Sequence, residues 1–465
     1  MLSANRFTKI AFLLMSGAVV ACSSVPASKS SVSSSTGLNS VDSISTEQKT
    51  RNKVAVEFSS NPALIGEPVG VRVSGLTPNA IISVRAERRG GWRRDELYRS
   101  EAQFAADHRG EVDLTTDQPL DDRWSPAGPY GLFRTMRSTE QPPPESLSKG
   151  KISISAFDQA GRRLAEKVLL QQASKEPLQE TPLGLEFPGA FVLRRVGSDP
   201  LPAIIILGGS EGGDSAARAS APLWAARGFA AVGYPYYSPA WGDQPQQIPG
   251  LPGGFADIPL DKLIDVRGAL SKRGDVQTDR IGLLGTSKGA EFVLAAASRI
   301  DGFAAVAAIV PSDVIWEGWG AGSTSGQTSS FSWMGEPLAF VPYVGIERAI
   351  GGVPDDQRVA MRVPHAEGRM AFPARVEAAR IRVENIDEPV FLLGGGRDQV
   401  WDSGDMAARI AARRAEAGLI TETLIFATAS HGIGGPPHQP TGADSALARE
   451  SGWRALQAFF ERHLK

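Results

Sequence analysis

Between residues 53 and 175, apolar and polar positions alternate in short runs separated by turn residues. A period of two is typical of strands that bury one face and expose the other. Such runs occur at Val54–Phe58, Val69–Val73, Ile81–Ala86, Glu111–Leu114 and Lys151–Ala156. Short alternating strands at this spacing predict an antiparallel β-sandwich of immunoglobulin-like type for residues 53–175.

From Gly184 onwards the pattern changes, because apolar runs of strand length now alternate with runs of helical periodicity. Buried strands are predicted at Ala203–Leu207, Phe229–Gly233, Ile281–Leu284, Phe303–Val310, Val390–Leu393 and Thr423–Phe426. Helices are predicted at Pro222–Arg227, Leu260–Arg273, Ala290–Arg299, Gly404–Ala417 and Asp444–His463. This alternation predicts a doubly wound, mostly parallel sheet for residues 184–465. Residues 311–383 interrupt it and could form a cap over a site at the strand ends.

The first residues resemble a secretory signal that ends at a lipidated cysteine. Met1–Cys22 combines basic residues with an apolar run, Ile10–Val20, that is too short to span a bilayer. The ending Val19-Val20-Ala21-Cys22 looks like a bacterial lipobox, and Ser23 after the cysteine favours the outer membrane. We therefore expect a protein anchored in the cell envelope through a lipid on Cys22, facing the periplasm. An ordinary signal peptide with an incidental cysteine is the alternative.

Composition adds three constraints. Residues 23–52 are serine-rich and poor in large apolar residues, so they are expected to form a flexible tether. The chain has 49 basic and 51 acidic residues, a balance that gives no field suited to nucleic acid. Cys22 is the only cysteine, and no histidine cluster has ligand spacing, so neither an internal disulfide nor a metal or other cofactor is expected.

The candidate chemistry centres on Gly285-Thr286-Ser287-Lys288-Gly289. A short apolar run, a tight Gly-x-Ser-x-Gly turn and an alanine-rich helix together form the pattern of a nucleophile elbow. Gly285 and Gly289 would let strand and helix pass closely. The N–H of Lys288 would then point at the oxyanion that forms when Ser287 attacks a carbonyl.

The same five-residue template occurs again at Gly208-Gly209-Ser210-Glu211-Gly212. Helical periodicity resumes only around Ala216, so Ser210 is expected in a loop rather than at a strand-to-helix turn. We therefore favour Ser287 as the nucleophile and keep Ser210 as its rival. The loop at 208–213, with Gly209 and Ser210, is expected to supply the second oxyanion amide.

A serine nucleophile needs a histidine to take its proton and an acid to orient that histidine. In this fold the chain order is Ser, then Asp or Glu, then His. Asp398 and His431 each follow a predicted strand, so both should lie at the same sheet edge as Ser287. The alternatives left open are His438 for the base and Asp402 or Asp405 for the acid.

Six segments carry a resemblance to a known family: Val73–Leu76, Gly128–Phe133, Leu207–Gly213, Tyr234–Tyr237, Gly282–Gly289 and Ser430–Gly432. Together they resemble the acyl-CoA thioesterases and bile acid-CoA:amino acid N-acyltransferases. The resemblance covers nearly all of the chain after the tether. It implies an immunoglobulin-like domain before an α/β-hydrolase domain, with Ser287 as nucleophile, Asp398 as orienting acid and His431 as base. It also implies hydrolysis of an acyl thioester, because members that transfer the acyl group to an amino acid typically carry a cysteine nucleophile.

One feature separates this chain from the family it resembles. CoA esters are intracellular, and CoA is not expected where a lipoprotein resides, so the resemblance supports the reaction class better than the substrate. A carboxylesterase acting on other esters is the first alternative, and an inactive hydrolase fold used for binding is the second. Lys288 could meet a CoA phosphate, but an exposed surface charge is the commoner explanation for such a lysine.

Overall fold

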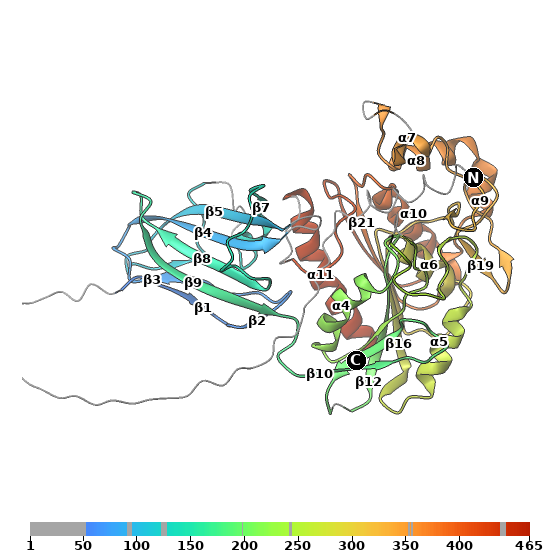
Figure 1. The fold of residues 1–465 in the computed structure, drawn as a ribbon, viewed down its shortest axis with the longest axis horizontal. Coiled ribbons are helices and arrows are strands. Elements are labelled where there is room, and N and C mark those ends of the chain that lie inside the picture. The colour runs from blue at the N-terminus through green and yellow to red at the C-terminus, as the bar shows by residue number, and fades with distance from the viewer. Residues whose placement is uncertain are drawn as a thin grey trace, which may run out of the picture.

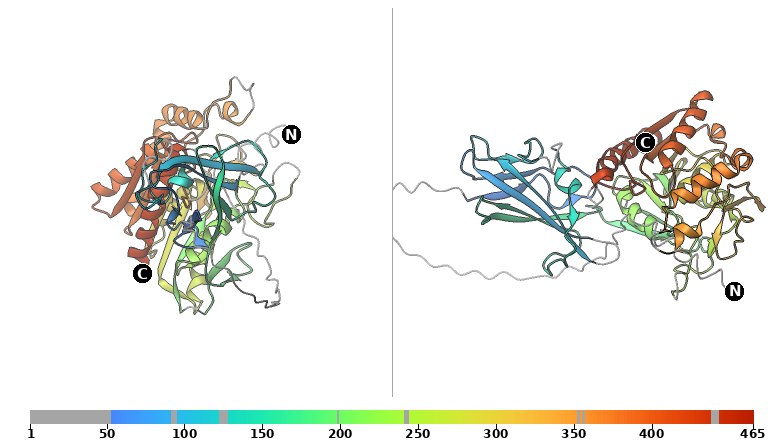
Figure 2. Two further views of the ribbon diagram at one scale, coloured as in Figure 1. Left: turned by 90° about the vertical axis from the view of Figure 1, so that its left-hand side faces the viewer. Right: turned by 90° about the horizontal axis from the view of Figure 1, so that it is seen from above.

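The computed structural model describes residues 53–465 except 91–94, 122–127, 198, 241–243, 352–353, 355–356 and 438–442. The predicted signal at 1–22 with Cys22, the predicted tether at 23–52 and the alternative base His438 lie outside the described residues. None of the helices in the described ranges is both long and apolar enough to cross a membrane. Figures 1 and 2 show a β-rich region followed by an α/β region.

The β-rich region consists of two sheets. One has the order β1 (Ala55–Phe58), β3 (Val71–Ser74), β6 (Val112–Asp113), and its neighbouring strands are antiparallel. The other has the order β2 (Ala63–Leu64), β9 (Arg163–Gln172), β8 (Lys151–Phe157), β4 (Ile81–Gly90), β5 (Glu96–Ala105), β7 (Arg137–Ser138). Buried positions alternate along β4, and Val73, Val84 and Ile154 are fully buried in one core. The period of two in the sequence therefore produced the predicted β-rich architecture.

The α/β region is built on one eight-stranded sheet. Its order is β10 (Leu178–Pro182), β11 (Phe191–Arg195), β13 (Ala230–Gly233), β12 (Leu201–Leu207), β16 (Val276–Thr286), β17 (Ala305–Ile309), β21 (Val390–Gly395), β22 (Thr421–Phe426). The six strands from β13 to β22 are parallel, whereas β10 and β11 are antiparallel at one edge. This mixed, mostly parallel sheet confirms the predicted fold class.

Helices cover both faces of this sheet, as Figure 1 shows. On the face toward the β-rich region lie α4 (Ser215–Ala225) and α11 (Ala443–Leu464), whose apolar side chains share one core. On the opposite face lie α5 (Lys262–Ser271), α6 (Lys288–Ala297) and α10 (Ser403–Glu416). Each of the five helices overlaps a range predicted from helical periodicity, because helices on a sheet bury one stripe.

The structure adds strands that the sequence analysis missed. In β9 only Leu169 is fully buried, so its apolar pattern is too weak to identify a strand. The edge strand β10 contains Pro182 and has no buried residue, which is a pattern typical of a loop. Because β10 already pairs in the eight-stranded sheet, that sheet begins before Gly184, the first residue predicted for the second region.

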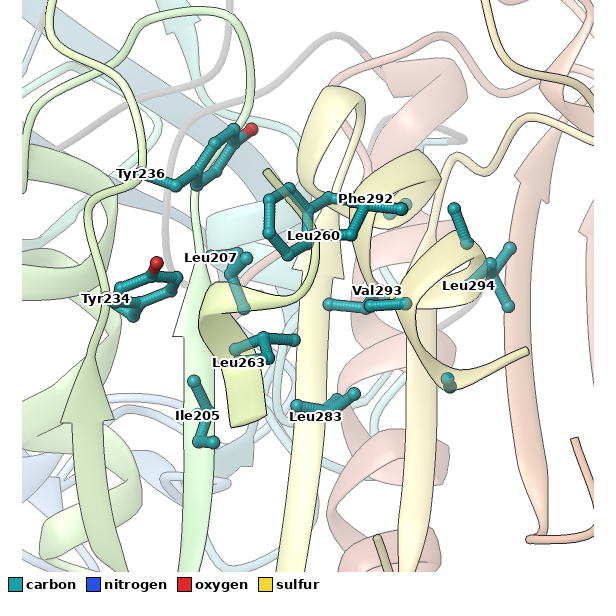
Figure 3. Close-up of a cluster of buried hydrophobic side chains, with 14 of the residues drawn as sticks. Ile205, Leu207, Tyr234, Tyr236, Leu260, Leu263, Leu283, Phe292, Val293 and Leu294 are labelled. Carbon is teal, nitrogen blue, oxygen red and sulfur yellow. The ribbon is translucent and has the colours of Figure 1, made fainter. Parts of the chain in front are cut away.

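A buried apolar cluster holds the central strands against α5 and α6 (Figure 3). Ile205 and Leu207 of β12 and Leu283 of β16 face Leu263 of α5 and Val293 of α6 in this cluster. All five side chains are almost completely inaccessible to solvent. The beginning of α6, where the candidate nucleophile lies, is therefore attached to a well-packed core.

The segment 311–383 forms short elements beyond the carboxyl ends of the strands. They are β18 (Trp319–Gly320), β19 (Phe331–Trp333), β20 (Glu336–Pro337), α7 (Glu347–Ile350), α8 (Arg362–Ala371) and α9 (Pro373–Ala378). Two short strands from the connection between β13 and α5, β14 (Gly254–Phe255) and β15 (Ile258–Pro259), pair with β18 and β19. The short helix η3 (Val383–Asn385) leads back toward the main sheet.

Candidate active site

Ser287 occupies the turn between the end of β16 and the start of α6. Its backbone has φ 57° and ψ −121°, a conformation that is costly for a residue with a side chain. The turn is held in place by a hydrogen bond of 2.9 Å from the Ser287 N–H to the carbonyl oxygen of Ile309 in β17. A strained serine at this position presents its hydroxyl beyond the strand end, as the elbow pattern predicts.

The two flanking glycines are required by close approach. A Cβ atom on Gly285 would overlap the carbonyl oxygen of Gly289. A Cβ atom on Gly289 would overlap the carbonyl oxygen of Gly208 and lie 2.7 Å from that of Leu207. No side chain fits in either place, because the obstructing atoms belong to the backbone.

Ser287, His431 and Asp398 form a continuous hydrogen-bonded chain. The Ser287 hydroxyl lies 2.9 Å from His431 Nε2, and His431 Nδ1 lies 2.8 Å from Asp398 Oδ2. Asp398 follows β21 and His431 follows β22, so neighbouring parallel strands bring both side chains to the elbow. An imidazole placed in this way can take the serine proton while the carboxylate fixes its tautomer.

Asp398 is fully buried and is held by several donors besides His431. Ser403 Oγ donates to Oδ2 at 2.6 Å, and the Val400 N–H donates to Oδ1 at 2.8 Å. Burial favours the neutral acid, but the charge of His431 and the hydrogen bonds from His431, Ser403 and Val400 together hold the pKa of Asp398 below its usual value. The carboxylate is therefore ionised and oriented toward the histidine.

The rival acids have other partners. Asp402, at the start of α10, accepts a hydrogen bond of 2.6 Å from Arg362, and Asp405 pairs with Arg409 within the same helix. Among the other histidines that the structure describes, His463 in α11 lies 3.7 Å from Glu422, away from the elbow. Of the candidates in the described ranges, only Asp398 and His431 are joined to Ser287.

Backbone N–H groups near Ser287 differ in their availability. The N–H of Gly209 donates to Glu211 Oε1 at 2.8 Å, so it is already engaged. The N–H groups of Ser210 and Lys288 make no hydrogen bond to another described residue. Gly209 nevertheless lies against the elbow, since a Cβ atom there would be 3.2 Å from Ser287 Cβ. Ser210 and Lys288 are therefore the free donors of the three predicted.

The side chain of Lys288 differs from its expected place on the surface. It is buried, and its ammonium donates to Glu291 Oε2 and to Ser330 Oγ, each at 2.8 Å. Burial lowers the pKa of Lys288 and raises that of Glu291, while their mutual attraction opposes both shifts. The i, i+3 spacing of Lys288 and Glu291 could have suggested a pair, but nothing in the sequence shows that residues 311–343 cover it.

A small cavity, partly open to solvent, adjoins Ser287. Ser210 and Lys288 line it beside the nucleophile, and Val400 and Trp401 extend the wall after Asp398. The segment 311–383 contributes Trp319, Tyr343, Ile346, Met361 and His365. These walls are mostly apolar, so the cavity suits an uncharged carbon chain next to the reactive group.

The sequence matches two family models. Residues 66–180 match the N-terminal region of the acyl-CoA thioester hydrolase/BAAT family, and residues 268–465 match its C-terminal region. Acyl-coenzyme A amino acid N-acyltransferase 1 of Mus musculus is 25% identical over 444 residues, 86% of this chain and 96% of its own. Acyl-coenzyme A thioesterase 1 of the same species is 26% identical over 427 residues, which cover 86% of this chain and 94% of that protein. Both halves of this chain match in order, and it belongs to the acyl-CoA thioesterase/BAAT family.

Proposed function

We propose that this protein is a serine hydrolase of acyl thioesters. The observation that carries the proposal is the hydrogen-bonded chain Ser287–His431–Asp398, with the serine in a strained elbow at the edge of a cavity. In this role Ser287 is the nucleophile, His431 is the general base and acid, and Asp398 orients the imidazole.

The proposed reaction has two halves. Ser287 Oγ attacks the thioester carbonyl as its proton passes to His431 Nε2, and the backbone N–H groups of Ser210 and Lys288 stabilise the oxyanion. Collapse of the tetrahedral intermediate breaks the carbon–sulfur bond, the thiolate takes the proton from His431, and an acyl-enzyme remains. Water then attacks the ester carbonyl with His431 again as base, and Ser287 regains its proton as the carboxylic acid leaves.

The choice of a thioester and of hydrolysis rests on the family. Relatives of this chain are named acyl-coenzyme A thioesterases, and others are named acyl-coenzyme A amino acid N-acyltransferases. We assign this chain to the hydrolytic reaction because its candidate nucleophile is serine rather than cysteine.

An envelope carboxylesterase is the second candidate, and the lipobox-like ending at Cys22 is the observation that favours it. We propose that the protein is anchored through Cys22 and faces the periplasm, where CoA is not expected. The same triad would hydrolyse an oxygen ester, because the acyl-enzyme and its hydrolysis are common to both reactions.

The proposal is tested with the protein that lacks residues 1–22 and with three substrates that share one acyl group. They are the acyl-CoA thioester, the acyl-N-acetylcysteamine thioester and the p-nitrophenyl ester. We expect thioester turnover that falls at least about a thousandfold in Ser287→Ala, because removing a triad nucleophile costs this much or more. Ser210→Ala, which keeps the backbone N–H, should retain most of the activity. Turnover of oxygen esters alone would support the carboxylesterase, and activity that survives in Ser287→Ala would refute the assignment of the nucleophile.

A further inference from the structure

The cavity beside Ser287 contains a second histidine that the triad does not use. His365 lies in α8 of the segment 311–383, is only 3% exposed and lines the cavity together with Ser287. Because His365 precedes Asp398 along the chain, it does not fit the order of nucleophile, acid and base in the triad. A buried imidazole in a mostly apolar wall is costly unless its polar atoms find partners, so its role needs an explanation.

The ring of His365 is held in one orientation. Its Nδ1 atom lies 2.7 Å from the carbonyl oxygen of Met361, one helical turn earlier. Three aromatic rings meet the imidazole at steep angles, with centroid distances of 4.5 Å for Trp316, 4.9 Å for Tyr343 and 5.6 Å for Trp401. Packing on several sides leaves little freedom to rotate away from the cavity.

The same contacts define which nitrogen carries the proton. A carbonyl oxygen can only accept, so Nδ1 of His365 must be the donor to Met361. Burial lowers the pKa of His365 to about 4, and the ring is therefore neutral at neutral pH. With the proton on Nδ1, the Nε2 atom is a hydrogen-bond acceptor, and no residue in the described ranges donates to it.

We propose that Nε2 of His365 accepts a hydrogen bond from a hydroxyl group on the acyl part of the substrate, so that the enzyme prefers hydroxyacyl thioesters to unsubstituted ones. This inference rests on the proposed hydrolase function and names its substrate class. Neighbouring walls formed by Trp319, Ile346, Met361 and Val400 are apolar and would contact the rest of the chain. A neutral hydroxyl fits this surrounding better than an ammonium, whose burial without a counter-charge would be costly.

The test compares butyryl thioesters of N-acetylcysteamine with their 2-hydroxy and 3-hydroxy analogues, which share one leaving group and one chain length. Wild-type protein should hydrolyse at least one hydroxyacyl thioester with a kcat/KM roughly tenfold higher than the butyryl thioester, as expected for a buried acceptor that gains its partner. The apolar variant His365→Phe should lose this preference while still hydrolysing the butyryl thioester. The variant His365→Gln, which retains a hydrogen-bond acceptor, should keep part of the preference for the hydroxyacyl thioester.

Two results would overturn the inference while leaving the hydrolase in place. One is a wild type that hydrolyses the butyryl thioester at least as well as both hydroxyacyl analogues. The other is a His365→Phe variant whose kcat/KM falls by the same factor for all three substrates, which would mark His365 as a packing residue. The melting temperature of this variant, compared with that of the wild type, measures any loss of stability. If the wild type hydrolyses none of these thioesters or the corresponding p-nitrophenyl esters, the proposed function itself fails, and the inference with it.

Discussion

Among single residues, Lys288 has two roles, one for its backbone N–H and another for its side chain. Its N–H lies next to the nucleophile, and its ammonium is buried between Glu291 and Ser330 with the rings of Phe255 and Phe331 about 5 Å away. Glu291 in turn accepts a hydrogen bond of 3.0 Å from the Trp316 N–H. The pair therefore ties the nucleophile helix to the segment that walls the cavity.

Breaking this pair should be costly. We predict that Lys288→Met or Glu291→Met lowers the free energy of unfolding by about 3–5 kcal/mol, because each leaves a buried partner uncompensated. The double variant Lys288→Met/Glu291→Met should lose clearly less than the sum of the two single losses. Denaturant unfolding of the four proteins measures the coupling.

An exposed pair provides the control for this cycle. Lys262 and Asp265 in α5 are 3.0 Å apart with the same i, i+3 spacing, but both side chains are more than half exposed. Lys262→Met should change stability by less than about 1 kcal/mol. Strictly additive effects at Lys288 and Glu291 would show that burial does not couple them.

At the scale of elements, β16, the elbow and α6 form the unit that positions the chemistry. This unit could be predicted from sequence because Gly285, Ser287 and Gly289 are local and the strand and helix patterns flank them directly. Asp398 and His431 could be placed at the same edge because parallel strands align their carboxyl ends. The surroundings of His365 and of the Lys288 side chain could not be predicted, because they come largely from the segment 311–383, which lacks regular periodicity.

The close approach of strand and helix gives a sharp prediction for Gly289. We expect Gly289→Ala to destabilise the protein by about 3 kcal/mol, since the new methyl group would overlap backbone atoms of Gly208 and Leu207. Esterase activity should fall even where the variant stays folded, because the shift displaces the elbow. The measurements are thermal unfolding and initial rates at a temperature below the transition.

Gly268 in α5 is the matched position with open space around it, since apart from neighbouring residues of its own helix no atom lies within 4 Å of a Cβ placed there. Gly268→Ala should leave activity unchanged and raise stability by up to about 1 kcal/mol, because alanine favours a helix more than glycine does. If Gly289→Ala proved as stable and active as Gly268→Ala, the tight elbow would not be needed.

At the scale of the whole molecule, the β-rich region attaches to the face of the sheet covered by α4 and α11, as Figure 1 shows. Arg134 of the β-rich region lies 3.1 Å from Glu450 of α11, and Arg227 after α4 donates to the carbonyl oxygen of Ile65 at 3.1 Å. The residues that line the cavity all come from the interval 210–401. The reactivity of Ser287 is therefore a property of the α/β region.

The reactivity of Ser287 is tested most directly by labelling the protein that lacks residues 1–22 with a fluorophosphonate probe and mapping the modified peptide by mass spectrometry. An unactivated serine does not react, whereas a serine hydrogen-bonded to a histidine base does. We expect a single label on Ser287 that is lost in Ser287→Ala, strongly reduced in His431→Ala and retained in Ser210→Ala. A label on Ser210, or a folded protein that takes no label, would contradict the assignment of Ser287 as the activated nucleophile.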